Sequence, residues 1–203
     1  MAAPTAPLWR AAMSEQLLAA DHGVSAVLNP DERARWSRLQ RQTDRDDFVA
    51  ARVLVRQLLV SAGVADDIAA IALAQKCAQC GGPHGRPSVV GHPEVFISWA
   101  HSNGRVAAAV SDRPLGIDIE PVDAGVPSLD GRARTVTEWV RLEALVKAGL
   151  TDLDGALHLV LDWPPSPDGR RFGDYLLIDA HDGKSSGVIA LAFASDHARD
   201  RHA

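Results

Sequence analysis

Two carboxylates two positions apart are the first residues whose types and spacing suggest chemistry. They are Asp118 and Glu120, within the run GIDIE at residues 116–120. Because alternate residues of a β-strand share a face, Ile117 and Ile119 would pack inward, and the two acids would lie together on the other face, about 7 Å apart. Two carboxylates at that separation can both reach a hard cation. The alternative is an ordinary half-exposed strand whose acids face water.

Glu143 and Lys147 form a second pattern, four positions apart in the segment WVRLEALVK at residues 139–147. On a helix, this spacing points both side chains in the same direction. The functional interpretation is a carboxylate that acts as metal ligand or base, beside a cation that holds an anionic substrate. The alternative is a surface ion pair, which contributes only about 0.3–0.5 kcal/mol.

His101 is the third candidate, in the segment SWAHSNG at residues 98–104. A histidine in a turn after a strand, flanked by hydroxyl groups, suits anion binding or proton transfer. A solvated turn histidine is the alternative, because the chain has seven further histidines.

Cys77, Cys80 and His84 offer three zinc ligands at plausible spacing, with His92 as a candidate fourth. Two reduced thiols are the alternative interpretation. A thioredoxin-type redox site is excluded, because it needs a helix where this chain has the turn-forming residues 81–83.

Arginines are concentrated between residues 31 and 56, where seven stand against five acids, although the whole chain has a formal net charge of −5. Arg45, Arg52 and Arg56 are separated by seven and four positions, so they form one stripe on a helix. Arginine binds phosphate through a planar fork of donors, so this stripe and Arg86 favour an anionic ligand. The alternative is a solvated helix face whose arginines pair with the interleaved acids at 44, 46 and 47.

The elements that must position these residues follow from periodicity and turn residues. Helices are predicted from Pro30 and over residues 43–62, with Thr43 and Asp46 as a capping box, and residues 77–93 are predicted as a loop. A third helix is predicted over residues 135–148. Strands are predicted at 95–98, 106–110 and 115–120, as an antiparallel meander, and at 157–163, 174–180 and 187–194. Helix followed by strands occurs twice, which predicts an α+β fold with two comparable halves, residues 1–113 and 114–203.

Composition excludes several classes. With 203 residues, 46% apolar and 23% charged, the chain is expected to fold rather than stay disordered. Two cysteines exclude a disulfide scaffold, and no apolar run is long enough to predict a membrane span. Arg10 and Glu15 interrupt the apolar stretch that a signal peptide needs. We therefore expect a soluble cytoplasmic protein with no membrane partner, and its acidity argues against nucleic acid as a partner. Phosphate-loop, dinucleotide-binding, GxSxG and HExxH motifs are also absent from the sequence.

The order of these motifs resembles the 4′-phosphopantetheinyl transferases of the Sfp type. The resemblance covers about residues 27–150, and its most specific part is the pair GIDIE and WxxxEAxxK at residues 116–120 and 139–147. It implies two similar α/β subdomains related by pseudo-twofold symmetry, with coenzyme A bound in the cleft between them. It further implies Mg²⁺-dependent transfer of the 4′-phosphopantetheine arm of coenzyme A to a serine of an acyl or peptidyl carrier protein, with release of 3′,5′-ADP.

The resemblance assigns roles residue by residue. We expect a monomer, since both halves of the cleft lie in one chain. The metal ligands implied are Asp118, Glu120 and Glu143; the catalytic residues implied are Glu143 as the base, Lys147 and His101; the coenzyme A ligands implied are Arg35, Arg52, Arg86, Ala100, His101 and Lys147.

The chain also departs from the family pattern. Only 22 residues separate Glu120 from Glu143, fewer than is usual in the family, where this stretch helps to receive the carrier protein. Glu32 stands where the family usually has a basic residue. Ala100 stands where it usually has Ser or Thr, and Leu142 stands where it usually has Lys. An alternative function is therefore a catalytically weakened module that binds coenzyme A or a carrier protein. A second alternative is a metal-dependent or zinc-stabilised domain in which these acids and cysteines are structural.

Overall fold

The computed structural model describes residues 6–19, 27–77, 81–82, 85–182 and 187–195. Its helices are α1 (Ser14–Ala19), α3 (Pro30–Trp36), α4 (Gln42–Ser61), the short 3₁₀ helix η1 (Ile68–Ala70), α5 (Val136–Ala148) and α6 (Leu153–Leu157). Its strands are β1 (Leu8–Met13), β2 (Leu73–Gln75), β3 (Pro87–Val89), β4 (Phe96–Ser102), β5 (Arg105–Ser111), β6 (Leu115–Pro121), β7 (Arg170–Phe172), β8 (Tyr175–Asp182) and β9 (Gly187–Ala194).

The strands form two antiparallel sheets. The first has the order β1-β5-β4-β3-β2 and the second has the order β6-β9-β8-β7. Every strand of the first sheet precedes residue 112, and every strand of the second follows residue 114. The predicted α+β fold is confirmed.

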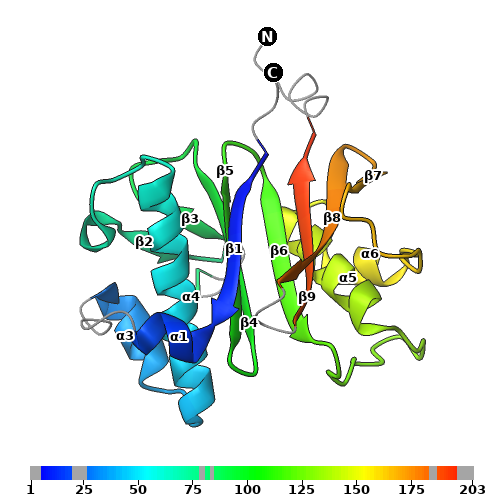
Figure 1. Cartoon of the computed structure of the whole chain (residues 1–203), viewed down its shortest axis with the longest axis horizontal. Helices are drawn as coiled ribbons and strands as arrows, with labels where there is room; N and C mark the ends of the chain where they lie inside the picture. The colour runs from blue at the N-terminus through cyan, green and yellow to red at the C-terminus, as the bar shows by residue number, and fades with distance from the viewer. Residues whose placement is uncertain (1–5, 20–26, 78–80, 83–84, 183–186, 196–203) are drawn as a thin grey trace.

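The inner faces of the two sheets pack against each other, while α4 and α5 cover the outer faces. On β5, Ala108 belongs to the core beneath α4, whereas Ala107 and Ala109 belong to the core between the sheets. On β6, Ile117 and Ile119 enter that same central core. Figure 1 shows α4 and α5 on opposite flanks of the molecule with the sheets between them. The arrangement brings β4 of the first sheet alongside β6 of the second, which is where the candidate residues lie.

The longer elements match their predictions. The helix predicted from Pro30 is α3, the helix predicted over 43–62 is α4, and the helix predicted over 135–148 is α5. Thr135 caps α5 through a capping box, and Gly149 ends it in a left-handed conformation with φ of 81°. The predicted capping box at Thr43 is wrong, because α4 begins one residue earlier, and its N-cap, Arg41, makes no side-chain cap hydrogen bond.

Several strand predictions are wrong. The meander is broken after β5, because β1 and β4 already occupy both edges of β5 and β6 pairs with β9 instead. The segment predicted as a strand at 157–163 is instead the end of α6 and irregular chain, since Asp152 caps a short helix there. The predicted loop at 77–93 contains β3, and β1 lies in a segment without a predicted element.

Gly116 sets how closely α5 approaches β6. A Cβ atom at this position would lie 2.1 Å from the carbonyl oxygen of Ala144 and 2.4 Å from the backbone nitrogen of Ala148. Both atoms belong to the backbone of α5, so neither can rotate away as a side chain would. Glycine is therefore required for the close contact between this strand and this helix.

We expect Gly116→Ala to lower the free energy of unfolding by about 1–3 kcal/mol, because the added methyl group overpacks the contact between β6 and α5. Urea unfolding measures the change. Gly125→Ala is the matched control, since a Cβ at that loop position meets no atom within 4 Å. Equal unfolding free energies for the two variants would contradict the close approach described here.

Within the described residues, no helix combines the length and the apolar character that crossing a bilayer requires.

Candidate active site

A buried ion pair between Asp118 on β6 and Lys147 on α5 forms the centre of the site. Lys147 Nζ donates to Asp118 Oδ1 at 2.5 Å. The side chain of Asp118 is only 7% exposed, whereas that of Lys147 is 30% exposed. The second oxygen of Asp118, Oδ2, is buried and accepts no hydrogen bond from the described part of the chain. The alternative interpretation, an ordinary half-exposed strand whose acids face water, is therefore wrong for Asp118.

Burial raises the pKa of Asp118 to about 6. Lys147 acts in the opposite direction through its charge and its hydrogen bond, while the negative charges of Glu143 and Glu120 raise the pKa further. Glu120 and Glu143, the other two carboxylates predicted as metal ligands, thus both lie close enough to Asp118 to act on its charge. Glu120 also accepts a hydrogen bond from Ser102 Oγ, at 2.6 Å.

The chemistry of these donors fits a hard cation. All three are carboxylates, and the unpartnered Asp118 Oδ2 is an acceptor that a cation would satisfy. Among the residues that the structure describes, no three Asp, Glu, His or Cys side chains are already arranged as a metal site. The acids are therefore neighbouring oxygen donors with Lys147 among them, and they are not a preformed cage.

In a metal-free buffer, we expect the wild-type free energy of unfolding to fall with rising pH relative to that of Asp118→Asn. The pKa of Asp118 is about 6 in the folded chain, against an ordinary 3.8. Raising the pH through this window removes a proton that the folded state binds more tightly, which destabilises the folded state. The difference in pKa corresponds to about 3 kcal/mol, fully expressed above about pH 7 and absent below about pH 4. Urea unfolding of both proteins at several pH values measures it, and a pH-independent difference would contradict the burial of the charge.

His101 lies on β4, as part of the strand rather than in the predicted turn, which is formed by Asn103 and Gly104. The surrounding protein removes part of its hydration and lowers its pKa, although the residue keeps an exposed surface. Asp47 raises this pKa, whereas Arg52, Lys147 and Arg35 lower it. Those cations come from α4, α5 and α3, so His101 lies where charges of both halves meet.

Two serines beside His101 tie β4 to β6. Ser98 Oγ accepts a hydrogen bond from the backbone nitrogen of Ile117 at 3.1 Å, and Ser102 Oγ donates to Glu120. These bonds join the first half to the second and fix the position of His101 relative to the carboxylates. The predicted segment 98–104 and the predicted segment 116–120 are therefore in direct contact.

Asp47 on α4 holds the turn that follows His101. Its Oδ2 accepts from the backbone nitrogen of Gly104 at 3.0 Å, and its Oδ1 accepts from Ser14 Oγ at 2.5 Å. Sequence reasoning assigned Asp47 to the arginine stripe and missed this role. No local signal could reveal it, because Asp47 and Gly104 lie 57 positions apart.

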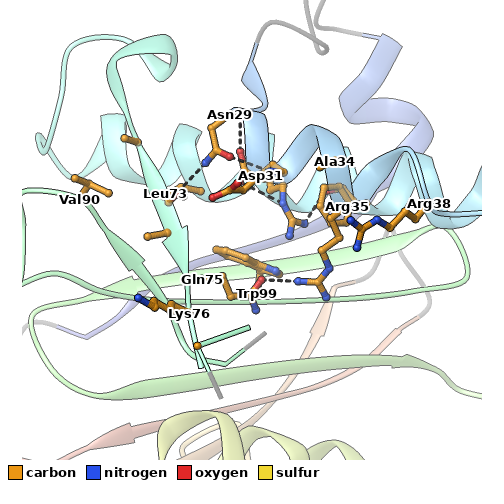
Figure 2. A pocket seen from close by; sticks show the side chains of 16 residues that line it. Asn29, Asp31, Ala34, Arg35, Arg38, Leu73, Gln75, Lys76, Val90 and Trp99 are labelled. Atoms are coloured by element: carbon orange, nitrogen blue, oxygen red, sulfur yellow. Dashed lines mark hydrogen bonds and ion pairs between the residues drawn. The ribbon is translucent and has the colours of Figure 1, made fainter. Parts of the chain in front are cut away.

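A pocket of about 700 Å³ lies between α3, α4 and β2. Figure 2 shows Arg35 reaching from α3 toward Gln75 and Trp99. Arg35 donates to Gln75 Oε1 at 2.8 Å. The pocket joins basic groups to aromatic faces, which suits an anionic ligand with a flat ring. Its basic lining residues are Arg35, Arg38, Arg52 and Lys76, and its aromatic ones are Phe48 and Trp99. Arg38, Lys76 and Trp99 were not predicted as ligands.

The arginine stripe is partly buried, and a buried carboxylate of α3 neutralises part of its charge. Arg52 and Arg56 are 3% and 1% exposed, and both pair with the buried Glu32, at 3.3 Å and 3.0 Å. Arg52 also stacks over Phe48, 3.3 Å from the ring centroid. Burial lowers the pKa of Arg52 to about 9, against the raising effect of Glu32. The interpretation of a solvated face paired with acids 44, 46 and 47 is therefore wrong.

Arg86 and Ala100 have different settings. The exposed Arg86 lies just before β3, yet its guanidinium covers Gly149 at the end of α5, where a Cβ would come within 3.0 Å of three guanidinium atoms. Arg86 thus bridges the halves two residues from Lys147. The methyl group of Ala100 is packed in the core between the sheets, so Ala100 offers a ligand only its backbone.

The predicted zinc site cannot be placed, because two of its residues, Cys80 and His84, lie outside the described residues.

No protein-family model matches the chain, and no curated protein is significantly similar to it.

Proposed function

We propose that the chain transfers the 4′-phosphopantetheine arm of coenzyme A to a serine of an acyl or peptidyl carrier protein, in a Mg²⁺-dependent reaction that releases 3′,5′-ADP. One observation carries this proposal: the residues of the separate sequence motifs meet around His101. Its pKa depends on Arg35, Arg52 and Lys147, and Lys147 is bound to Asp118. Asp118 in turn responds to Glu120 and Glu143.

The basic pocket supplies the affinity for coenzyme A in this proposal. Arg35, Arg38 and Lys76 line it with positive charge, and Trp99 lines it with an aromatic face. The phosphates and the adenine ring of coenzyme A need these two kinds of contact. His101 lies on β4, which contacts β6 of the second half, and Lys147 of that half acts on it electrostatically. We therefore assign these two residues to the phosphates nearest the reacting centre.

Glu143 removes the proton of the carrier serine. Glu143 is half-buried on the same helix as Lys147, one turn earlier, and it makes no hydrogen bond or ion pair with the described residues. A carboxylate with free acceptor oxygens can accept the hydroxyl proton directly or through water. A Mg²⁺ ion held by Asp118, Glu120 and Glu143 would neutralise pyrophosphate charge and polarise the phosphoryl group. The serine attacks the phosphorus directly, so the chain needs no nucleophile of its own.

The two halves support a related proposal about the fold, that they are similar subdomains related by a pseudo-twofold axis. Each half lays one long helix, α4 or α5, over the outer face of one antiparallel sheet. The sheets then face each other across the central core. We further propose a cytoplasmic monomer, in which residues 1–113 bind coenzyme A and residues 114–203 carry the metal-binding and catalytic groups.

A module that binds coenzyme A or a carrier protein without efficient transfer is the second candidate. Two observations favour it. The connection between β6 and α5 contains no helix or strand over residues 122–134, where a carrier would dock. Glu32 also neutralises Arg52, which weakens the contribution of this arginine to anion binding.

Incubation with an apo carrier protein, coenzyme A and Mg²⁺ separates the two candidates when binding is measured in parallel. Gain of one phosphopantetheine by the carrier supports transfer. Calorimetric binding of coenzyme A without any mass gain would leave only the binding module.

A further inference from the structure

Asp118 already has a counter-ion in the fold, and this counter-ion is Lys147. The ammonium lies 2.5 Å from Oδ1 of a carboxylate that is almost fully buried. A buried carboxylate is costly unless a cation neutralises it, so Lys147 stabilises the charged form of Asp118. Any divalent cation that binds Asp118 must therefore contend with a cation that belongs to the protein.

Lys147 does not fully satisfy the hydrogen-bonding and charge requirements of Asp118 and its two neighbouring carboxylates. Asp118 Oδ2 is buried without a hydrogen-bond partner in the part of the chain that the structure describes. The charges of Glu143 and Glu120 act on Asp118 as well. Three carboxylates and one ammonium leave an excess of negative charge, and a divalent cation would neutralise more of it than a lysine can.

The two partners differ in their freedom to move. Asp118 is fixed on β6 and packed under α5, whereas the side chain of Lys147 is 30% exposed on a flexible four-carbon stem. Lys147 also contributes to the electrostatic surroundings of His101. An ammonium that leaves Asp118 therefore stays within electrostatic range of His101, where the proposed function locates the substrate phosphates.

We propose that Lys147 is a resident counter-ion that a divalent cation displaces from Asp118, an inference that rests on the proposed metal site. The displaced ammonium becomes available to bind substrate phosphates. Lys147 thus couples metal binding to substrate binding, because the metal binds more weakly in its presence and coenzyme A binds better once the metal is bound.

Direct Mn²⁺ binding tests this competition without any transfer reaction. Electron paramagnetic resonance of free Mn²⁺, without coenzyme A or carrier, gives the dissociation constant. We expect Lys147→Gln to bind Mn²⁺ about tenfold more tightly than wild type, because no ammonium competes for Asp118. Arg171→Gln is the matched control, since it removes an exposed positive charge on β7 and should leave the affinity unchanged. Asp118→Asn should abolish the binding.

A second measurement follows the Mg²⁺ response in the wild-type chain, and a variant is needed only to assign one resonance. The chain has three lysines, Lys76, Lys147 and Lys184, so Lys147→Arg assigns the side-chain Cε resonance of Lys147. We expect added Mg²⁺ to shift this resonance and to leave the resonance of Lys76 in place.

Unchanged or weaker Mn²⁺ binding by Lys147→Gln would overturn the inference, as would a Lys147 resonance that does not respond to Mg²⁺. Failure of the inference can be distinguished from failure of the proposed function. A carrier that gains mass without any such competition would leave transfer standing and remove only the role of Lys147. Competition without any mass gain would support the role of Lys147 and remove the transfer reaction.

Discussion

Glu143→Gln should reduce the rate of phosphopantetheine transfer by about 10²–10⁴-fold, the range that loss of a general base typically produces. The substitution keeps the shape of the side chain but removes its basicity and its negative charge. It should leave the fold intact, because Glu143 forms no ion pair or hydrogen bond with the described residues and raises the pKa of Asp118 by like-charge repulsion. Carrier mass against time measures the rate, and thermal unfolding measures stability.

Glu15→Gln is the control for this variant, since it makes the same chemical change at an exposed position of α1. We expect it to transfer at the wild-type rate. Transfer by Glu143→Gln at that same rate would remove Glu143 from both the role of base and the set of metal ligands.

Arg141→Leu should lower the free energy of unfolding by about 3–5 kcal/mol, because it leaves Asp179 as a buried charge without its partner. Arg141 and Asp179 are 0% and 5% exposed and are joined by two hydrogen bonds, at 2.8 Å and 2.7 Å. Arg141 also donates to the backbone oxygens of Leu161 and Trp163, so it attaches α5 to the irregular segment after α6. Urea unfolding checks this value.

The double variant Arg141→Leu with Asp179→Leu separates the buried charge from the lost hydrogen bonds. Removing both charges should recover part of the stability, because no uncompensated charge remains. Recovery should be incomplete, since the backbone nitrogen of Ser166 donates to Asp179 and loses that acceptor. A single variant as stable as wild type would contradict the buried pair.

Local sequence patterns predicted the elements whose determinants are local. The segment of α5 carries its own start and stop signals, Thr135 with Glu138 as a capping box and Gly149 as a left-handed cap, and the predicted range matches the helix. The strand β9 has an apolar run that is buried along its whole length, and it was predicted with its observed ends.

Features that depend on distant partners could not be predicted in the same way. The sheet to which β6 belongs depends on β1, because β1 occupies the edge of β5 that a meander would have used. The burial of Arg56 depends on Glu32, which lies 24 positions earlier. A charged pattern on a helix indicates a solvated face unless a buried partner is known, and sequence spacing gives no information about that partner.

The candidate site illustrates the same division. Strand alternation predicted that Asp118 and Glu120 share one face of a strand. Helical spacing predicted that Glu143 and Lys147 share one face of a helix. That the lysine pairs with Asp118 across the contact between β6 and α5 follows from the close packing at Gly116, which no periodic pattern reveals. The pocket beside Arg35 depends on Lys76, which follows β2, and on Trp99 of β4, so distant parts of the chain must meet to form it.

The mass of a carrier protein after incubation tests the central claim most directly. Apo acyl and peptidyl carrier proteins are each incubated with the chain, coenzyme A and Mg²⁺, and Glu143→Gln serves as the blank. We predict that at least one carrier gains one phosphopantetheine only when the wild-type chain, coenzyme A and Mg²⁺ are all present, with release of an equal amount of 3′,5′-ADP. If every carrier keeps its apo mass while the chain binds coenzyme A, the transferase account is contradicted.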